Sequence, residues 1–282
     1  MSREEMSKDV SGSTGTSKGS SGNETVTAAG NLDGPISGSR LSRDENVKQP
    51  VKKTKQELER VIFVGRTFEE YMRMFDLREE ELHGLSILDC PAGACSFTAV
   101  GSKLGMDITA CDIAYDHMLD DLEAKGLLDI KHAMETMEEA KALYIWDYYG
   151  DVPGLGRHRH KALQECVQDM KERPGRYIPA VLPELPFGDE QFHLVLSAHF
   201  LFMYGDRLDY DFHRKTVHEL LRVASDEVRI FPLVDLTGTR YEHLDRLKAE
   251  LEAEGCRTEE RNVPYEFLRN ANAMLCIRKP RF

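Results

Sequence analysis

The stretch LSILDCPAGACS at residues 85–96 decides the fold of this chain. Its first half is a short apolar run that ends in small residues, which is typical of a strand buried inside a parallel sheet. A helical pattern follows over 96–104, and Gly105 stands where a helix commonly ends. A buried strand, a tight loop and a helix in this order predict the first unit of an α/β domain.

Helices and strands alternate along the rest of the chain. Thr67 and Glu70 have the spacing of a capping box ahead of an apolar helical face. Further elements are expected as strands at 107–112, 192–197, 227–233, 256–263 and 273–279, and as helices at 114–125, 211–223 and 244–251. We expect Gly126 and Gly255 to close two of these helices, and a second capping box at 239–242 to open the last one. The alternation predicts one doubly wound α/β domain with a parallel sheet.

Two segments fall outside this pattern. Residues 1–50 contain 10 Ser, 7 Gly and 4 Thr and no aromatic residue, so they cannot bury enough apolar surface to offset chain entropy. They are predicted to form a disordered N-terminal tail, and residues 51–282 to form the domain. Within that domain, residues 132–176 are rich in Met, Tyr and charge. We expect them to be a helical insertion that lies over one edge of the sheet and caps the substrate.

Composition narrows the classes of partner. The chain carries 49 acidic and 37 basic side chains and a net charge of −12, which disfavours a nucleic-acid partner. No apolar run approaches the roughly 18 residues of a membrane-spanning helix. The N-terminus lacks the apolar core of a secretory signal, and six cysteines suit reduced thiols. These features predict a cytoplasmic protein with a small-molecule substrate and neither a nucleic-acid nor a membrane partner.

The first loop indicates the kind of cofactor. Ligands of doubly wound sheets bind at the carboxyl ends of the strands. A dinucleotide fingerprint would place three glycines where this chain has Pro91, Gly93 and Ser96, and proline has no amide hydrogen to donate. Asp89 could accept a hydrogen bond from an ammonium group, and Asp112 could accept from both ribose hydroxyls. S-adenosylmethionine has these groups and lacks a pyrophosphate.

The chain resembles the class I, Rossmann-like S-adenosylmethionine-dependent methyltransferases. The resemblance rests on four stretches: ILDCPAGAC at 87–95, ACDI at 110–113, ELPFGDEQFHLVLS at 184–197 and HELLRV at 218–223. It covers about 61–279. It implies a mostly parallel, seven-stranded sheet whose last strand is antiparallel, and S-adenosylmethionine as the cofactor.

The resemblance also implies the roles of individual residues. The loop formed by Pro91, Ala92 and Gly93 would pass beneath the methionine part of the cofactor. Asp112 would bind the ribose, and Ile113 would pack on the adenine. The segment leading to Leu185 would follow the adenine edge, and Ser197 would end the fourth strand near the reacting methyl group.

Two side chains are candidates for catalysis. His199 follows the fourth strand, and an imidazole could act as a general base there, although a packing or helix-capping histidine is the alternative. Tyr148 belongs to an aromatic cluster with Trp146 and Tyr149, and its hydroxyl could orient an acceptor unless the cluster is ordinary core packing. Arg66 could meet the carboxylate of the cofactor, but the start of a helix explains its position equally well.

No metal site is expected, because His158 and His160 would point apart on a helix. The sequence therefore predicts an S-adenosylmethionine-dependent methyltransferase that acts on a small molecule, with a protein side chain as the second option. One alternative is a non-catalytic regulatory module that binds S-adenosylmethionine. The other is a nicotinamide-dependent oxidoreductase of the same architecture.

Overall fold

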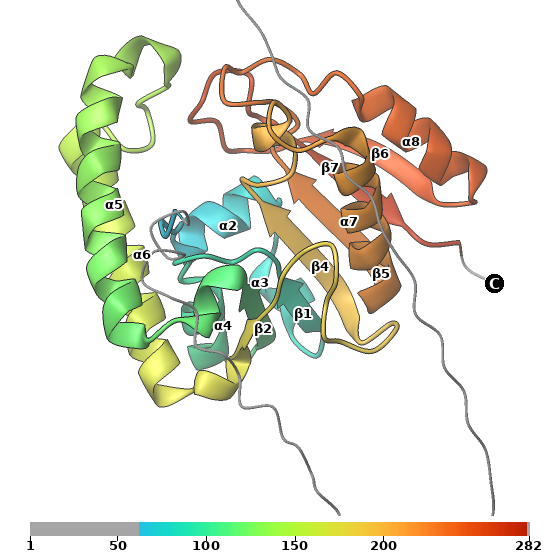
Figure 1. Cartoon of the computed structure of the whole chain (residues 1–282), viewed down its shortest axis with the longest axis horizontal. Helices are drawn as coiled ribbons and strands as arrows, with labels where there is room; N and C mark the ends of the chain where they lie inside the picture. The colour runs from blue at the N-terminus through green and yellow to red at the C-terminus, as the bar shows by residue number, and fades with distance from the viewer. Residues whose placement is uncertain (1–61, 281–282) are drawn as a thin grey trace, which may run out of the picture. The chain divides into compact units, whose positions relative to one another are not determined.

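A computed structural model describes residues 62–280 and contains one seven-stranded sheet, shown in Figure 1. The strands lie in the order β3-β2-β1-β4-β5-β7-β6. Their bounds are β1 Ser86–Asp89, β2 Asp107–Asp112, β3 Tyr177–Pro179, β4 Phe192–Ala198, β5 Ala224–Phe231, β6 Arg257–Asn262 and β7 Ala273–Arg278. The first five strands pair in parallel, and β7 runs antiparallel to β5 and β6. This topology confirms the predicted fold class, including the antiparallel last strand.

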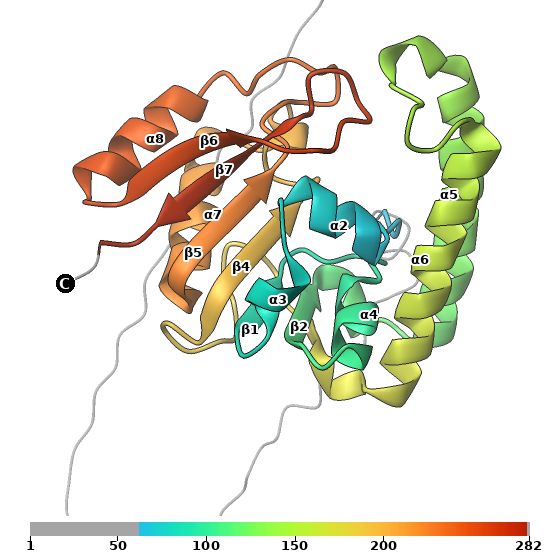
Figure 2. The same cartoon turned by 180° about the vertical axis from the view of Figure 1, so that it is seen from behind.

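Helices cover both faces of the sheet (Figures 1 and 2). Their bounds are α2 Phe68–Met74, α3 Glu79–Leu82, α4 Phe97–Lys103, α5 Leu119–Glu139, α6 Val152–Glu172, α7 Tyr210–Val223 and α8 Leu244–Ala253. Side chains of α7 and α8 pack with Leu88 and Val195 on one face, whereas side chains of α2 and α4 pack with Ile87 and Leu196 on the other. Adjacent residues of a strand thus pack into the hydrophobic cores on opposite faces of the sheet, because successive side chains point to opposite faces.

The predicted helical insertion is part of a longer helical hairpin, made of α5 and α6. The two helices pack against each other beside the β2–β3 edge, and α6 also contacts α4. Gly126 does not end the first helix as predicted but lies inside α5. A Cβ atom on Gly126 would lie 2.7 Å from Cδ1 of Leu163 in α6, so the glycine permits close packing of the two helices.

Local signals at helix ends gave mixed results. The first capping box is confirmed, since the amide of Thr67 donates to Glu70 Oε2 and that of Glu70 donates to Thr67 Oγ1. The second is wrong: α8 begins at Leu244 without a side-chain cap. The amide of Thr239 instead donates to Asp235 Oδ1 within a turn.

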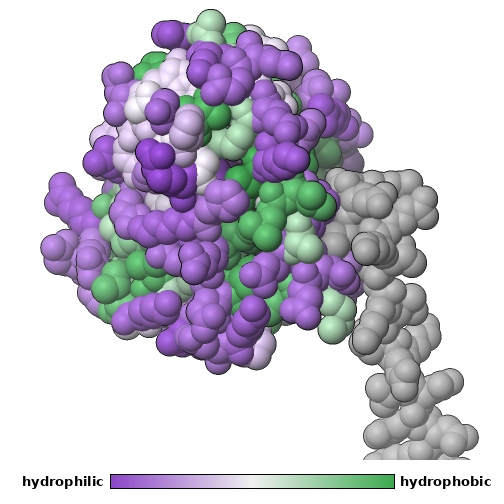
Figure 3. Space-filling view, turned by 90° about the vertical axis from the view of Figure 1, so that its left-hand side faces the viewer, coloured by the Kyte–Doolittle hydropathy of each residue, from purple (hydrophilic) through white to green (hydrophobic). Residues whose placement is uncertain are grey.

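The face that carries the hairpin mixes polar and apolar side chains (Figure 3). Leu127 and Leu128 of α5 are among the exposed apolar residues. None of the helices between residues 62 and 280 has the length and apolar character needed to cross a membrane. The predicted tail at 1–50 lies outside the described residues.

Candidate active site

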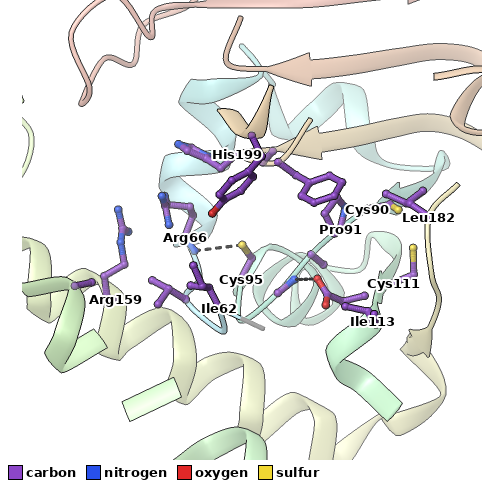
Figure 4. Close-up of a pocket in the computed structure, with 18 of the residues that line it drawn as sticks. Ile62, Arg66, Cys90, Pro91, Cys95, Cys111, Ile113, Arg159, Leu182 and His199 are labelled. Carbon is purple, nitrogen blue, oxygen red and sulfur yellow. Dashed lines mark hydrogen bonds between the residues drawn. The ribbon is translucent and has the colours of Figure 1, made fainter. Parts of the chain in front are cut away.

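A cavity of about 770 Å³ opens at the carboxyl ends of the central parallel strands (Figure 4). Its size falls within the range of small-molecule sites in proteins. The loop after β1, the end of β2 and the segment after β4 all contribute to its walls. Helices α5 and α6 and the loop between β6 and β7 add an apolar part. Ligands of doubly wound folds bind at this edge of the sheet.

Asp112 ties the loop after β1 to the end of β2. Its Oδ2 accepts from the amide of Gly93, and its Oδ1 accepts from the amide of Ala114, both at 2.8 Å. The hydroxyl of Tyr115 donates to the carbonyl of Gly93, which has a φ of +54°. Burial raises the pKa of the Asp112 carboxyl, and the two amides oppose this shift. Each carboxylate oxygen keeps a further lone pair that can accept from a ligand.

Most amides of this loop already donate to protein acceptors. The amide of Cys90 donates to Leu196, that of Ala92 to Cys111, and that of Cys95 to Ala92. The Gly93 amide is held by Asp112, and Pro91 has no amide hydrogen. The loop therefore offers few donors to a phosphate group.

The segment at residues 62–66 crosses over this loop. A Cβ atom on Gly65 would lie 1.8 Å from the carbonyl oxygen of Ala94, so only glycine allows the close approach. The amide of Arg66 donates to Cys95 Sγ (3.2 Å), and its carbonyl accepts from the amide of Ser96 (2.9 Å). These contacts place the Arg66 side chain at the cavity wall.

Asp89 lies below the cavity rather than on its wall. Its side chain is fully buried, and Oδ1 accepts from the hydroxyl of Tyr71 at 3.0 Å. Its Oδ2 has no hydrogen-bond partner within the described part of the chain. Burial raises the pKa of the Asp89 carboxyl well above its usual range. The carboxyl lies outside the cavity lining, and its predicted binding of an ammonium group stays a prediction.

His199 lies on the cavity wall directly after β4. Its backbone has a φ of +53°, and its amide donates to the carbonyl of Phe231. The Nδ1 atom is buried and has no partner among residues 62–280. Burial lowers the pKa of the imidazole well below its usual value, and the charges of Arg66 and Arg159 lower it further. His199 is therefore neutral near pH 7, and one ring nitrogen has a lone pair that can accept a hydrogen bond.

The other predicted residues divide into two groups. Pro91, Ala92, Gly93, Asp112 and Ile113 line the same cavity as His199. Three predicted residues lie outside the cavity lining, namely Ser197, Leu185 and Tyr148. Ser197 is buried in β4, and Leu185 belongs to the hydrophobic core beneath α7. The Tyr148 ring packs against Tyr149 and Arg73, which is the core-packing alternative named above.

Ala180, Val181 and Leu182 line the cavity beyond the end of β3, within the segment leading to Leu185 that the resemblance placed near the adenine edge. The structure also adds residues to the site that the sequence did not indicate. The apolar part is formed by Met134 and Met137 of α5, Leu155 of α6, and Phe267. The methionine-rich composition of the insertion was a weak signal for the α5 residues, and no local pattern marked Phe267.

A buried polar network fixes the hairpin next to this cavity. Arg159 of α6 donates from one nitrogen to both carboxylate oxygens of Glu70 in α2, at 2.8 and 2.9 Å. The hydroxyl of Tyr149 contacts both Glu70 and Tyr265. Burial alone would raise the pKa of Glu70, but Arg159, Arg66 and the Thr67 amide together lower it to about 2. Within residues 62–280, no group of three or more His, Cys, Asp or Glu side chains is placed to hold a metal ion.

Comparison with known proteins identifies a relative that matches most of the chain. The uncharacterised protein MJ0045 of Methanocaldococcus jannaschii is 34% identical over 223 residues, which cover 79% of this chain and 98% of the archaeal protein. The chain belongs to the family of this archaeal protein. No family model matches the chain.

Solved structures with a similar arrangement include two methyltransferases. A magnesium protoporphyrin IX methyltransferase from Synechocystis, with bound S-adenosylmethionine, is 13% identical, covers 80% of this chain and 79% of its own, and has a TM-score of 0.39. An S-adenosylmethionine-dependent methyltransferase from Aquifex aeolicus is 14% identical, covers 80% of this chain and 98% of its own, and has the same TM-score of 0.39.

Proposed function

We propose that the chain is an S-adenosylmethionine-dependent methyltransferase that acts on a small molecule. The observation that carries this proposal is the position of Asp112 at the end of β2, bonded to the loop after β1 and exposed to a cavity that also contains His199. The same edge of the sheet thus holds a ribose-binding carboxylate and a candidate base. The apolar walls beyond them suit an organic acceptor more readily than a polypeptide backbone.

The residues of the cavity fit this cofactor. Asp112 keeps a lone pair on each oxygen for the ribose hydroxyls. Ile113 and Leu182 provide apolar surface for the adenine, and the loop from Pro91 to Gly93 would lie along the methionine part. Because most amides of the loop already donate to protein acceptors, few of them could donate a hydrogen bond to a pyrophosphate. This favours a nucleoside without phosphates over a nicotinamide dinucleotide.

The cofactor supplies an activated methyl group, so the protein mainly has to align the acceptor and exclude water. The apolar hairpin residues and Phe267 would exclude water from one side of the cavity. His199 would accept a hydrogen bond from an acceptor hydroxyl or amine, because burial keeps its imidazole neutral. Its Nδ1 would then gain the hydrogen bond that it lacks within the described residues.

Calorimetric titration with S-adenosylhomocysteine tests the cofactor assignment. The wild-type chain is expected to bind it, and Asp112→Asn is expected to weaken binding by about 1–3 kcal/mol through loss of a charged acceptor. Asp107→Asn is the matched control, since this carboxylate lies at the exposed start of the same strand. It should leave the affinity unchanged. Absence of binding to the wild-type chain would contradict the proposed function.

A further inference from the structure

One arginine of the cavity forms no ion pair with any residue that the structure describes, although its charge helps to lower the pKa of the Glu70 carboxyl. Three arginines line the cavity, namely Arg66, Arg159 and Arg207, and Asp112 is the only carboxylate among the lining residues that the structure describes. Arg159 pairs with buried Glu70, and Arg207 pairs with Asp206 at the exposed rim. Within the described chain, Arg66 forms no ion pair.

The hydrogen-bonding capacity of the Arg66 side chain is largely unused. Its one contact to a described acceptor is a long one, 3.5 Å from Nη1 to the carbonyl of Gly65. Its Nε is buried and has no partner among the described residues. A buried guanidinium donor without an acceptor costs free energy, so a ligand that supplies an anion here would remove this cost.

Arg66 faces the end of the cavity that we assign to the acceptor. In Figure 4 it lies toward His199, whereas Ile113, Cys111 and Leu182 lie at the opposite end. Its charge contributes to the lowered pKa of His199, and it opposes the rise that burial causes in the pKa of Tyr144 and Tyr265. Tyr144 stacks on Phe267, a residue of the cavity wall.

The neighbouring walls define the rest of the ligand. Met134, Met137, Leu155 and Phe267 present apolar surface in the same cavity as Arg66. Methionine side chains adapt to apolar ligands of different shape. Among the residues that the structure describes, an ammonium group would find no free carboxylate near Arg66, because Glu70 already pairs with Arg159.

We propose that the acceptor is an apolar small molecule that carries an acidic group, and that Arg66 binds this group. A guanidinium binds a carboxylate through two parallel hydrogen bonds, which also fixes the orientation of the ligand. The inference rests on the proposed function and adds the chemical class of the substrate. Arg66 could instead bind the carboxylate of the cofactor, and the test separates these two sources of the anion.

The first experiment compares three probes of one shape and different charge. Naphthoate, its amide and its aminomethyl analogue are titrated into the full chain saturated with S-adenosylhomocysteine. The carboxylate is expected to bind about tenfold or more tightly than the amide, and the amine is expected to bind most weakly. Equal affinities, a preference for the amine, or no binding of any probe would overturn the proposal.

The second experiment uses Arg66→Gln, with Arg78→Gln as the control that makes the same change in net charge. Arg78 is exposed and lies before α3, outside the cavity lining. Arg66→Gln is expected to weaken naphthoate binding by about tenfold and to leave the affinity for S-adenosylhomocysteine within a few-fold of wild type. The control should change neither value.

The outcomes separate this inference from the function on which it rests. If Arg66→Gln weakens S-adenosylhomocysteine binding and the carboxylate is still preferred, Arg66 holds the cofactor and the acceptor proposal is wrong. If the wild-type chain binds S-adenosylhomocysteine but does not distinguish the three probes, this inference alone fails. If the wild-type chain does not bind S-adenosylhomocysteine, the proposed function fails and the inference fails with it.

Discussion

His199 combines two features that each cost free energy in a folded chain. Its φ of +53° lies in the left-handed region, which residues other than glycine adopt uncommonly. Its Nδ1 is buried without a partner among residues 62–280. Unfavourable features of this kind concentrate at functional sites, where the surrounding structure holds them in place. The role of His199 in the reaction stays a prediction, and these two features are the structural reason for making it.

The buried imidazole should make stability depend on pH. Because burial lowers its pKa in the folded state, the unfolded chain takes up a proton below about pH 6.5 while the folded chain does not. The free energy of unfolding should therefore fall as the pH drops below this value and be unaffected above it. His199→Asn tolerates the backbone conformation and should reduce the loss between pH 7.5 and 5.5 by about 1 kcal/mol, measured by urea denaturation. An unchanged pH dependence would contradict a buried neutral imidazole.

At the scale of elements, two ion pairs join α2 to α6 and differ mainly in burial. Arg159 binds Glu70 at 2.8 Å with both side chains buried, and Lys161 binds Glu69 at the same distance with both side chains about half exposed. Glu70 also caps α2, so the buried pair ties the hairpin to a helix end. Because α6 carries Leu155 of the cavity wall, this pair helps to position the apolar part of the site.

Removing one partner from each pair tests this difference. Arg159→Met leaves the Glu70 carboxylate buried without its cation and should destabilise the fold by about 3–5 kcal/mol. Lys161→Met is the matched control and should cost about 0–1 kcal/mol, since exposed pairs contribute little. Urea denaturation monitored by circular dichroism measures both values. Similar small losses for the two variants would show that the buried network does not hold the hairpin.

At the scale of the whole molecule, the choice of cofactor follows from the loop and the strand end together. A thermal unfolding assay with S-adenosylmethionine, S-adenosylhomocysteine and NAD at matched concentrations tests it. A ligand at about 100 times its dissociation constant adds about 2.7 kcal/mol, which raises the midpoint by roughly 5–10 °C in a domain of this size. We expect this rise with the two sulfur nucleosides and none with NAD. A rise with NAD alone would instead favour the oxidoreductase.

Patterns among residues close together in the sequence predicted most of the helices and strands. The apolar run at β1, the capping box from Thr67 to Glu70 and the strand that ends at Asp112 all formed as expected. The spacing of apolar residues and the residues that cap a helix are local patterns, so a single sequence is enough to predict them. The same patterns placed the loop after β1, Asp112 and His199 at one edge of the sheet, and they line one cavity.

Contacts between distant segments decided the rest of the site. The sequence could not show that Asp89 is buried and accepts a hydrogen bond from Tyr71. Nor could it show that Gly126 lies inside a helix, where it allows close contact with Leu163. Arg159 and Glu70 are 89 positions apart, and Phe267 reaches the cavity from the loop between β6 and β7. The sequence by itself determined most of the strands and helices and the cofactor edge, because these depend on local pattern, but it missed the short strand β3 and the true end of α5. Only the tertiary structure decided which side chains share the acceptor end, because burial and pairing there depend on how separate elements pack.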